Sequence, residues 1–451
     1  MTYTILGAGL SGLSCSYHIG HEQCTILESK THPGGHIYSY ESDGFIWDEG
    51  PHVSFTQNNY VQNLFAKSVN DDFNEFPVRI ENYFHGSWIP HPAQSNLYAI
   101  PEPLRTKCLN SFLTSRDAET SEIPYNYGEW LDKAFGSVFS QKFPYSYTKK
   151  YWTVSPEILT TDWVGERVYY PEIKIVKNGY KTPQTEPTHY IKTVRYPKVG
   201  GFYSFAKDLV SEANIIFGSS IQSIDLKNKR IGLRNGNYHE YEKLINTIPL
   251  PEFIRLAKPP KKILNAVNQL LCTSLLLINI TAPHPPKLSS QWFYVYDDDK
   301  LSTRVNNTGL MSSGNAPNGK TGIQVEVYFS KYKPQTISNE SVTEIVCKEI
   351  IEMGVIDSVE TVHTNFVPYA NIIFDHPRRE NQNIVLEWLE GYGLIRESDD
   401  LEPMTDWSTV KAGTIGDLVL AGRFAQWKYF WSDDCILRGK HLASCNNIAS
   451  Q

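Results

Sequence analysis

The first thirty residues alternate apolar runs and glycines in an order that predicts a βαβ unit. Residues 2–6 read Thr-Tyr-Thr-Ile-Leu, a short run of β-branched, aromatic and aliphatic side chains that is typical of a buried strand. Residues 7–12 carry glycine at their first, third and sixth positions, and the apolar residues after them predict a helix. A second apolar run over residues 23–27 predicts the next strand.

The glycines of this unit have the spacing Gly-x-Gly-x-x-Gly, which indicates dinucleotide binding. Gly7 permits the tight turn, Gly9 lets the backbone approach a pyrophosphate, and Gly12 lets the helix pack on the strand. The amino end of the helix then faces the phosphates. Glu28 closes the second strand, where a carboxylate can accept hydrogen bonds from a ribose.

Strands and helices are predicted along the rest of the chain as well. Residues 37–48 predict a hairpin that turns at Asp43-Gly44. Further strands are predicted over residues 215–218, 221–225 and 418–421, and residues 241–250 predict a buried strand that ends in a loop. Helices are predicted over residues 126–139, 342–353 and 435–443. Residues 174–193, which are rich in Lys, Thr and Pro, predict an exposed loop.

Length and composition limit the class of protein. A chain of 451 residues is longer than one hydrophobic core usually organises, so we expect two or more domains. The net charge of −7 argues against a nucleic-acid-binding surface. Seven cysteines without a Cys-x-x-Cys pair argue against a disulfide framework and favour the cytoplasm. The most apolar later run, residues 270–280, is shorter than the ~20 residues of a membrane span, and we expect no metal site.

A glycine pair after the βαβ unit indicates which dinucleotide cofactor the site binds. Gly34 and Gly35 come six residues after the predicted ribose acid, and they resemble the extended fingerprint of the superfamily of FAD-dependent amine oxidases and protoporphyrinogen oxidases. In these flavoproteins a loop with an acid, a glycine and a histidine lies against the isoalloxazine ring. Residues 49–52, Glu-Gly-Pro-His, match that loop. The resemblance implies that FAD is the cofactor, that Gly50 binds it and that His52 is its catalytic neighbour.

A third cofactor segment lies near the carboxy end of the chain. Apolar residues 418–421 enter a turn at Gly422 and Arg423, and Asp433 precedes the predicted helix over residues 435–443. A helix amino terminus presents backbone N–H groups to negative charge, as on a reduced flavin. The resemblance implies that Gly422, Arg423 and Asp433 bind FAD, with Arg423 facing the pyrophosphate.

Four segments resemble UDP-galactopyranose mutases, especially the longer eukaryotic type, and occur in the same order as in those enzymes. They are residues 84–97, 163–168, 195–202 and 422–429. The first contains Gly-Ser-Trp-Ile-Pro-His-Pro-Ala-Gln-Ser-Asn-Leu, in which His91 replaces the usual tyrosine. The resemblance implies that Trp88 and Asn96 of this segment bind substrate.

The diphosphate of a nucleotide sugar carries about two negative charges, and guanidinium groups match its oxygens with fork geometry. Arg167 lies in a matching Gly-Glu-Arg run, and an ion pair with an acid such as Glu166 is the alternative. Arg304 corresponds by approximate position to an arginine on the mobile loop of the mutases. The resemblance implies that both arginines bind substrate and act in catalysis. Tyr429 is a candidate donor to a phosphate oxygen, with packing as its alternative.

The scattered cofactor segments predict a discontinuous α/β fold. A Rossmann-like FAD-binding domain of the amine-oxidase type is expected to carry an inserted α+β substrate domain. The FAD-binding domain is expected to take residues 1–85, 195–255 and 406–451. The substrate domain is expected to take residues 86–194 and 256–405.

The resemblance to the mutases implies an interconversion of the pyranose and furanose forms of a nucleotide sugar. In that reaction N5 of reduced FAD attacks the anomeric carbon, NAD(P)H is the implied reductant, and assembly into a homo-oligomer is left open. An FAD-dependent oxidoreductase of the amine oxidase or protoporphyrinogen oxidase type has the same cofactor domain and is the first alternative. A binding or scaffold protein that has lost catalysis is the second.

Overall fold

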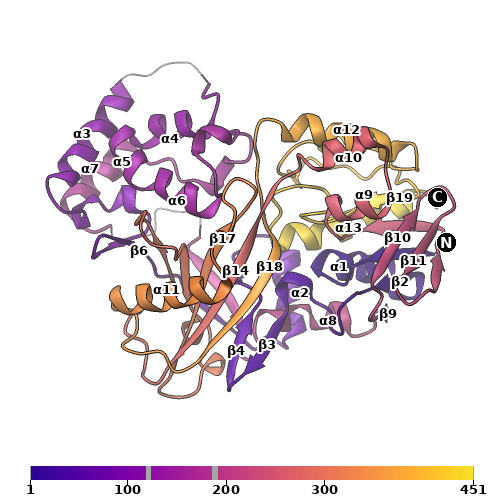
Figure 1. Cartoon of the computed structure of the whole chain (residues 1–451), viewed down its shortest axis with the longest axis horizontal. Coiled ribbons are helices and arrows are strands. Elements are labelled where there is room, and N and C mark those ends of the chain that lie inside the picture. Colours follow the sequence, from indigo (N-terminus) through magenta and orange to yellow (C-terminus); the bar gives the residue numbers. More distant parts are fainter. Residues whose placement is uncertain (1, 118–122, 185–190, 450–451) are drawn as a thin grey trace.

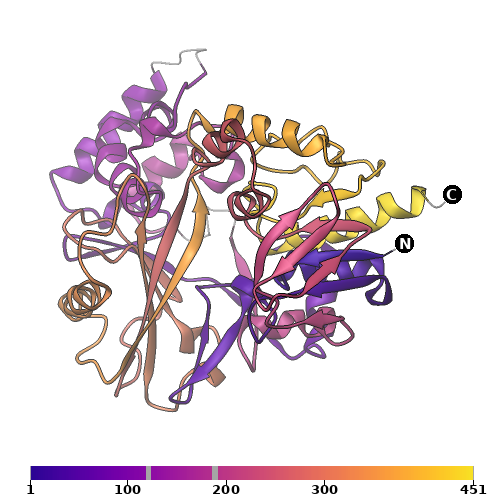
Figure 2. The ribbon, with the colours of Figure 1, turned by 45° about the vertical axis from the view of Figure 1, so that its right-hand side comes forward.

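The computed structural model of the chain describes residues 2–117, 123–184 and 191–449. A five-stranded parallel sheet joins segments from both ends of the chain and from its middle, in the order β19-β13-β1-β2-β9 (Figure 1). Its strands are β1 (Tyr3–Leu6), β2 (Cys24–Leu27), β9 (Ile215–Ile216), β13 (Lys243–Asn246) and β19 (Leu418–Leu420). The described ends of the chain therefore lie on the same side of the molecule (Figure 2).

Two helices pack on each other and on this sheet, α1 (Leu10–Ile19) and α13 (Ser432–Ala449). Glycines make the close approach possible, because a Cβ at Gly12 would lie 2.1 Å from the carbonyl oxygen of Gly7. The predicted βαβ unit is confirmed, and the predicted carboxy-terminal helix extends beyond its expected ends. Helices α2 (Asn59–Ser68), α8 (Lys207–Val210) and α9 (Leu250–Leu256) complete this half of the molecule.

Three small sheets connect the parts of the chain. The predicted hairpin is confirmed as β3 (Ser39–Ser42) and β4 (Phe45–Asp48), and Asp43 and Gly44 have the positive φ angles of its turn. An antiparallel sheet contains β10 (Ile221–Asp225), β11 (Arg230–Leu233) and β12 (Tyr238–Glu240). Strand β5 (Phe73–Pro77) pairs with β8 (Thr193–Pro197).

A seven-stranded sheet dominates the other half, in the order β18-β14-β17-β16-β15-β6-β7. Its strands are β6 (Ile80–Phe84), β7 (Ser87–Pro90), β14 (Cys272–Ala282), β15 (Trp292–Val295), β16 (Arg304–Asn307), β17 (Thr321–Phe329) and β18 (Val362–Ile372). Helix α11 (Asn339–Glu352) covers one face, where Val325 and Val327 pack against Val342 and Val346. Because side chains alternate along a strand, Glu326 points to the opposite face.

A helical layer lies beyond the edge of this sheet (Figure 1). It contains α3 (Leu104–Asp117), α4 (Tyr127–Phe135), α5 (Ser137–Lys142), α6 (Pro144–Tyr151) and α7 (Ile173–Lys181), while α10 (Lys261–Val267) and α12 (Arg378–Glu390) pack on each other nearer the parallel sheet. The predicted helix over residues 126–139 is divided at Gly136, where the chain takes a positive φ angle.

The predicted loop over residues 174–193 is wrong in its first part, which forms helix α7. Val176 of this helix is buried in the main core and Gly179 lies against the backbone of Ser95, so packing overrides a composition typical of loops. Residues 185–190 of the predicted loop lie outside the described residues.

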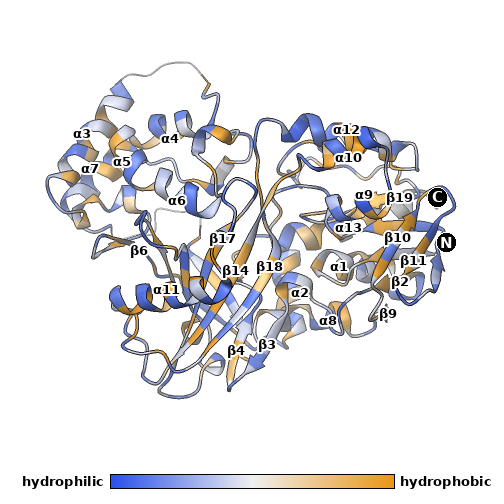
Figure 3. Cartoon of the chain, viewed as in Figure 1, coloured by the Kyte–Doolittle hydropathy of each residue, from blue (hydrophilic) through white to orange (hydrophobic). Residues whose placement is uncertain are grey.

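The fold is a mixed α/β fold with a parallel sheet and a large second sheet, as the sequence predicts. Figure 3 shows hydrophobic residues along the interior strands and hydrophilic residues on outer helices such as α12. The domain boundaries stay a prediction, although β6, within residues 1–85, pairs with β15 of the large sheet. In the described ranges, no helix combines the length and apolar character of a membrane span, and no cluster of His, Cys, Asp and Glu could hold a metal ion.

Candidate active site

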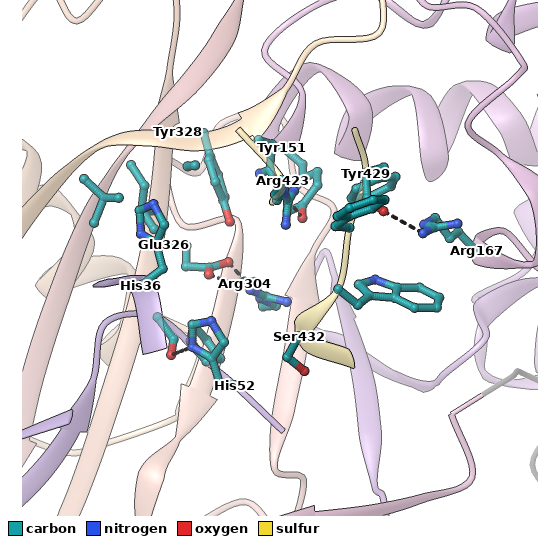
Figure 4. Close-up of a pocket in the computed structure, with 18 of the residues that line it drawn as sticks. His36, His52, Tyr151, Arg167, Arg304, Glu326, Tyr328, Arg423, Tyr429 and Ser432 are labelled. Atoms are coloured by element: carbon teal, nitrogen blue, oxygen red, sulfur yellow. Dashed lines mark hydrogen bonds and ion pairs between the residues drawn. The ribbon is translucent and has the colours of Figure 1, made fainter. Parts of the chain in front are cut away.

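A cavity of about 650 Å³ lies where the parallel sheet, the seven-stranded sheet and the helical layer meet. Its volume lies within the range of ligand sites in proteins. The cofactor residues predicted from the sequence that line it are Gly7, Gly9, Glu28, Gly34, Gly35, Gly50, His52 and Arg423. The predicted substrate residues Arg167, Arg304 and Tyr429 line the same cavity, so residues from distant segments meet at one site (Figure 4).

The glycine-rich end of the cavity is a cradle that side chains would fill. A Cβ at Gly35 would lie 2.9 Å from the Cα of Gly9, so the two backbones pass each other in direct contact. The N–H of Gly34 donates to the carbonyl of Ala8 at 2.8 Å, which fixes this crossing. Glu28 faces the cavity from the end of β2, held by the backbone N–H groups of Ala8 and Lys30 at 2.8 Å each. This shape and acid fit a dinucleotide.

Arg423 supplies a positive charge to the same wall. Its Nη2 donates to Asn371 Oδ1 at 2.9 Å, whereas its buried Nε has no hydrogen-bond partner among the described residues. Within these residues no carboxylate pairs with it. Ser432, the first residue of α13, lines the same cavity, so the positive end of the helix dipole faces it. An anion such as a pyrophosphate fits this unpartnered donor.

His52 is held in one orientation and is neutral. Its Nδ1 donates to the carbonyl oxygen of Gly50 at 2.8 Å, which leaves Nε2 as a hydrogen-bond acceptor. Burial lowers the pKa of His52 to about 4, and the charges of Arg304 and Arg423 add to this effect. Burial likewise lowers the pKa of the neighbouring His36 to about 3. At neutral pH neither ring carries the second proton that would let it act as an acid.

Arg167 lies against aromatic rings at the other end of the cavity. Its guanidinium carbon is 4.5 Å from the centre of the Tyr429 ring and 4.1 Å from that of Trp431. Nη2 donates to the carbonyl oxygen of Tyr429 at 2.7 Å, and Nη1 contacts Met404 Sδ. The side chain of Glu166, the alternative partner of Arg167, lies outside the described part of the structure.

Arg304 lies on strand β16. The arginine of the mutases to which it corresponds by approximate position lies on a mobile loop. It faces Glu326 across the antiparallel pair of β16 and β17. Its Nε and Nη2 donate to the two carboxylate oxygens of Glu326 at 2.7 and 2.6 Å. Figure 4 shows this pair near the middle of the cavity, between His52 and Tyr328. Glu326 was not among the residues predicted from the sequence.

Other predicted residues lie outside the lining. Gly12 and Gly422 act through close packing, since a Cβ at Gly422 would lie 2.3 Å from Ser11 Oγ. Asp433 accepts a hydrogen bond from the N–H of Asp434 at the start of α13 and does not line the cavity, whereas its neighbour Ser432 does.

Trp88 and Asn96 differ from the expectation that they bind substrate. The ring of Trp88 packs edge-on against Tyr83 and Phe293 in the core under α11. Asn96 is buried, with Nδ2 donating to the carbonyl of Pro92 and Oδ1 accepting from the N–H of Gln184. Other residues of this segment line the cavity instead, namely His91, Pro92 and Gln94.

Most residues of an aromatic wall in the cavity were not singled out from the sequence. It contains Tyr127, Tyr147, Tyr151, Trp152, Trp163, Tyr169, Tyr294, Tyr296, Tyr328 and Tyr369. Tyr147 and Tyr151 are four residues apart on helix α6, and Tyr294 and Tyr296 are two residues apart at β15, so each pair shares a face. These spacings are the signal that could have found them.

Comparisons with known structures agree with this fold. A crystal structure of reduced UDP-galactopyranose mutase has a TM-score of 0.87 at 22% identity, covering 100% of this chain and 94% of that one. A putative protoporphyrinogen oxidase from Exiguobacterium sp. 255-15 has a TM-score of 0.71 at 16% identity, covering 99% of each chain. At these identities the likeness establishes the fold.

Sequence comparison identifies related proteins and a family. The 4,4'-diaponeurosporene oxygenase of Staphylococcus aureus is 27% identical over 132 residues, which are 29% of this chain and 26% of that enzyme. The match thus spans about a quarter of that enzyme's length. The family model of flavin-containing amine oxidoreductases matches residues 10–445. This chain belongs to the family of flavin-containing amine oxidoreductases and is a flavoenzyme with FAD as its cofactor.

Proposed function

We propose that this flavoenzyme interconverts the pyranose and furanose forms of a nucleotide sugar of the UDP-galactose type. The active form would hold reduced FAD, with NAD(P)H as the external reductant. When bound, reduced FAD supplies a nucleophilic nitrogen for the anomeric carbon of the sugar. The residues of the chain bind the diphosphate, orient the sugar and exclude water, which lowers the barrier by positioning and electrostatics.

The observation that carries this proposal is that Arg167 and Tyr429 lie in the same cavity as the glycine cradle. A diphosphate bound at Arg167 would direct the sugar toward the end of the cavity where FAD is expected. The guanidinium stacked on Tyr429 and Trp431 is already oriented, so less freedom is lost on binding. As the nucleotide leaves the anomeric carbon, the positive charge stabilises the negative charge that develops on the diphosphate.

His52 would act as an acceptor of a hydrogen bond rather than as an acid. Its Nδ1 is committed to Gly50, and its lowered pKa keeps Nε2 unprotonated at neutral pH. A hydroxyl or N–H group beside it can donate to Nε2. The proposal therefore assigns His52 to orientation of the flavin or the substrate.

An FAD-dependent oxidoreductase is the second candidate function. The aromatic wall favours it, because stacked tyrosine and tryptophan rings also suit a flat, apolar substrate such as a porphyrinogen. The arginines weigh against an amine substrate, since a cation would be repelled by Arg423. The two candidates differ in whether the substrate is oxidised: the mutase leaves the oxidation state of the sugar unchanged, whereas the oxidoreductase removes electrons from its substrate.

Anaerobic incubation of the reduced holoenzyme with UDP-galactofuranose separates these candidates. The mutase is expected to form UDP-galactopyranose over many turnovers while the FAD spectrum stays that of the reduced cofactor. The oxidised holoenzyme is then mixed with a porphyrinogen or an amine. Bleaching of the oxidised flavin, with peroxide formed in air and without sugar interconversion in the first assay, would contradict the mutase and support the oxidoreductase.

A further inference from the structure

The segment over residues 195–202 does not line the cavity, although it resembles a segment of the mutases. It lies behind residues 48–54, here called the His52 loop, which carries His52 in the cavity wall (Figure 4). The N–H of Arg195 donates to the carbonyl oxygen of Ser54 at 2.7 Å, and the N–H of Ser54 donates back to the carbonyl oxygen of Arg195 at 3.0 Å. The far end of the His52 loop is therefore fixed to this segment.

Asp48, the first residue of the His52 loop, is bound by three donors. Its Oδ2 accepts from the hydroxyl of Tyr196 at 2.7 Å. Its Oδ1 accepts from the hydroxyl of Ser39 at 2.6 Å and from the N–H of Phe202 at 3.0 Å. Burial raises the pKa of Asp48 to about 6, and these hydrogen bonds oppose that rise, so the group is mainly ionised at neutral pH. A carboxylate only accepts hydrogen bonds, so three donors match it.

Glycine makes the contact with Asp48 possible. Gly201 has a φ angle of 75°, and a Cβ at this position would lie 2.7 Å from Asp48 Oδ1. A larger residue would therefore push the carboxylate away from the N–H of Phe202. The hydroxyl of Tyr196 is oriented as well, because it accepts a hydrogen bond from Asn315 Nδ2 at 3.1 Å. Its own proton is then directed to Asp48.

The main chain connects this carboxylate to the imidazole of His52. The carbonyl oxygen of Asp48 accepts from the N–H of Gly50 at 2.8 Å and from Nε2 of Gln324 at 2.9 Å. The carbonyl oxygen of Gly50 in turn accepts from Nδ1 of His52 at 2.8 Å. The ring of Phe202 also packs on that of His52, with ring centres 5.4 Å apart. A shift of Asp48 would move both the turn that holds Nδ1 and the ring that packs on the imidazole.

The burial of Asp48 is costly for a contact that only stabilises the fold. The residue is 6% exposed, and a buried carboxylate loses its hydration. The three groups that donate to it are neutral, so no opposite charge offsets that loss. What the arrangement provides is direction, because a polar network with every member bonded specifies one geometry. The residue that this geometry reaches in the cavity is His52.

We propose that Asp48 and Tyr196 are positioning residues, which hold the imidazole of His52 against the flavin through the turn at Gly50. The segment over residues 195–202 is then the support of the His52 loop. This inference rests on the proposed function only where that places His52 beside the flavin. It applies to a mutase and to an oxidoreductase alike, because no sugar contact enters it.

Bound FAD reports the position of His52 in the holoenzyme. Two signals are measured, the visible circular dichroism of the flavin and the dissociation constant of FAD. Asp48→Asn and Tyr196→Phe are each expected to weaken FAD binding about 3- to 10-fold, the effect of a lost hydrogen bond. Both should change the flavin dichroism in the same direction as His52→Ala. In the His52→Ala background the same two substitutions are expected to cost less than about 2-fold.

Asp72→Asn is the matched control. Asp72 pairs with Lys198 of the same segment at 2.7 Å, and both side chains are exposed. This substitution removes a carboxylate bound to the segment but keeps the bonds of Asp48, so neither flavin signal is expected to change. Tyr196→Phe retains the buried ring and stands in for Asp48→Asn if that variant does not fold, as judged by thermal unfolding.

Three results would overturn the inference. Equal losses of FAD affinity in the wild-type and His52→Ala backgrounds mean that Asp48 and Tyr196 support the fold without acting through His52. Unchanged flavin signals in the folded variants mean that they do not position His52. If His52→Ala itself leaves both signals unchanged, His52 does not lie against the flavin. Absence of sugar interconversion would contradict the proposed function alone, because none of these measurements uses a nucleotide sugar.

Discussion

Single side chains in the cavity differ in how their charge is balanced. Arg304 is paired with Glu326, whereas Arg423 donates to the amide of Asn371 and has no carboxylate partner within the described residues. His36 and His52 are buried beside these arginines and are neutral for that reason. The three arginines of the lining are matched in number by Glu28, Glu49 and Glu326, so the cavity has no net charge, and its positive charge is local to Arg167 and Arg423.

Arg167 is the side chain whose removal tests anion binding most directly. Arg167→Ala is expected to weaken UDP binding about 10- to 100-fold, the loss expected for a charge-assisted hydrogen bond. FAD content should not change. Calorimetry on the holoenzyme measures the affinity, and Arg230→Ala serves as the control because Arg230 stacks on the exposed Tyr238 on another sheet. An unchanged affinity in Arg167→Ala would remove Arg167 from the substrate site.

His52 predicts a pH dependence of the stability of the apo protein. Its pKa is 6.5 when unfolded and about 4 when folded, so the unfolded chain binds more protons between these values. Stability should therefore fall as the pH drops from 6.5 to 4, by roughly 3 kcal/mol from His52 alone. Urea unfolding at each pH measures this slope. In His52→Asn the slope should be smaller, and an identical slope would show that His52 is not buried as described.

Helices α1 and α13 are held at the cofactor site by a close contact at a glycine. The N-terminal end of α13 lines the cavity, and its middle packs on α1 at Gly439, where a Cβ would lie 2.3 Å from Ser14 Oγ. Helix α1 in turn begins at the glycine cradle. Both ends of the chain thus contribute to one rigid wall of the cofactor site.

Gly439→Ala should separate these helices. The added methyl group has no space, so unfolding free energy is expected to fall by about 1–3 kcal/mol and FAD retention to fall with it. Thermal unfolding and the flavin absorbance of the purified protein measure both effects. Gly413→Ala is a matched control, because nothing lies within 4 Å of a Cβ at that position. If both variants behave alike, the contact between α1 and α13 does not control cofactor binding.

The molecule as a whole depends on a charged network that holds its last segment in place. Glu397 pairs with Arg438 and His441 of α13, and the buried Lys428 pairs with Asp399. Burial alone would raise the pKa of Glu397, but Arg438 and His441 hold it at about 2. Cys445 and Glu397 raise the pKa of His441 to about 9. The network joins α13 to the segment before β19.

This network predicts loss of stability at high pH. His441 has a pKa of 6.5 when unfolded and about 9 when folded, so its contribution is complete below pH 6.5 and disappears as the pH rises through 9. The midpoint of thermal unfolding should fall between pH 6.5 and 9.5, and less so in His441→Asn. Glu397→Gln should lower the midpoint at pH 7 and also reduce this dependence. A wild-type midpoint that does not change over this range would contradict the pairing.

Much of the cofactor site could be read from the chain because its features are local. The spacing of Gly7, Gly9 and Gly12 and the acid at Glu28 form one continuous βαβ unit. The hairpin at Asp43-Gly44 follows from a turn that needs positive φ angles. In both cases the residues that decide the conformation are neighbours in sequence, so no distant contact is required.

Local composition and resemblance are insufficient where distant packing decides the conformation. Helix α7 forms because Val176 reaches the core, although its surroundings are typical of a loop. Trp88 lies in a segment that resembles a substrate site, yet its strand turns the ring toward Phe293. Whether a helix forms and where a side chain points depend on which face of the helix or strand packs against the rest of the molecule.

The order of apolar residues and glycines was sufficient to specify a dinucleotide cradle and a mixed α/β fold, since both arise from short-range geometry, whereas FAD followed from the family resemblance. It was not sufficient to specify the partner of Arg304. That depends on strand register, which places Glu326 opposite it. The aromatic wall likewise arises only when α6, β15 and β17 converge on one cavity. Register and convergence are properties of the folded chain, because they are set by side chains that meet from distant segments.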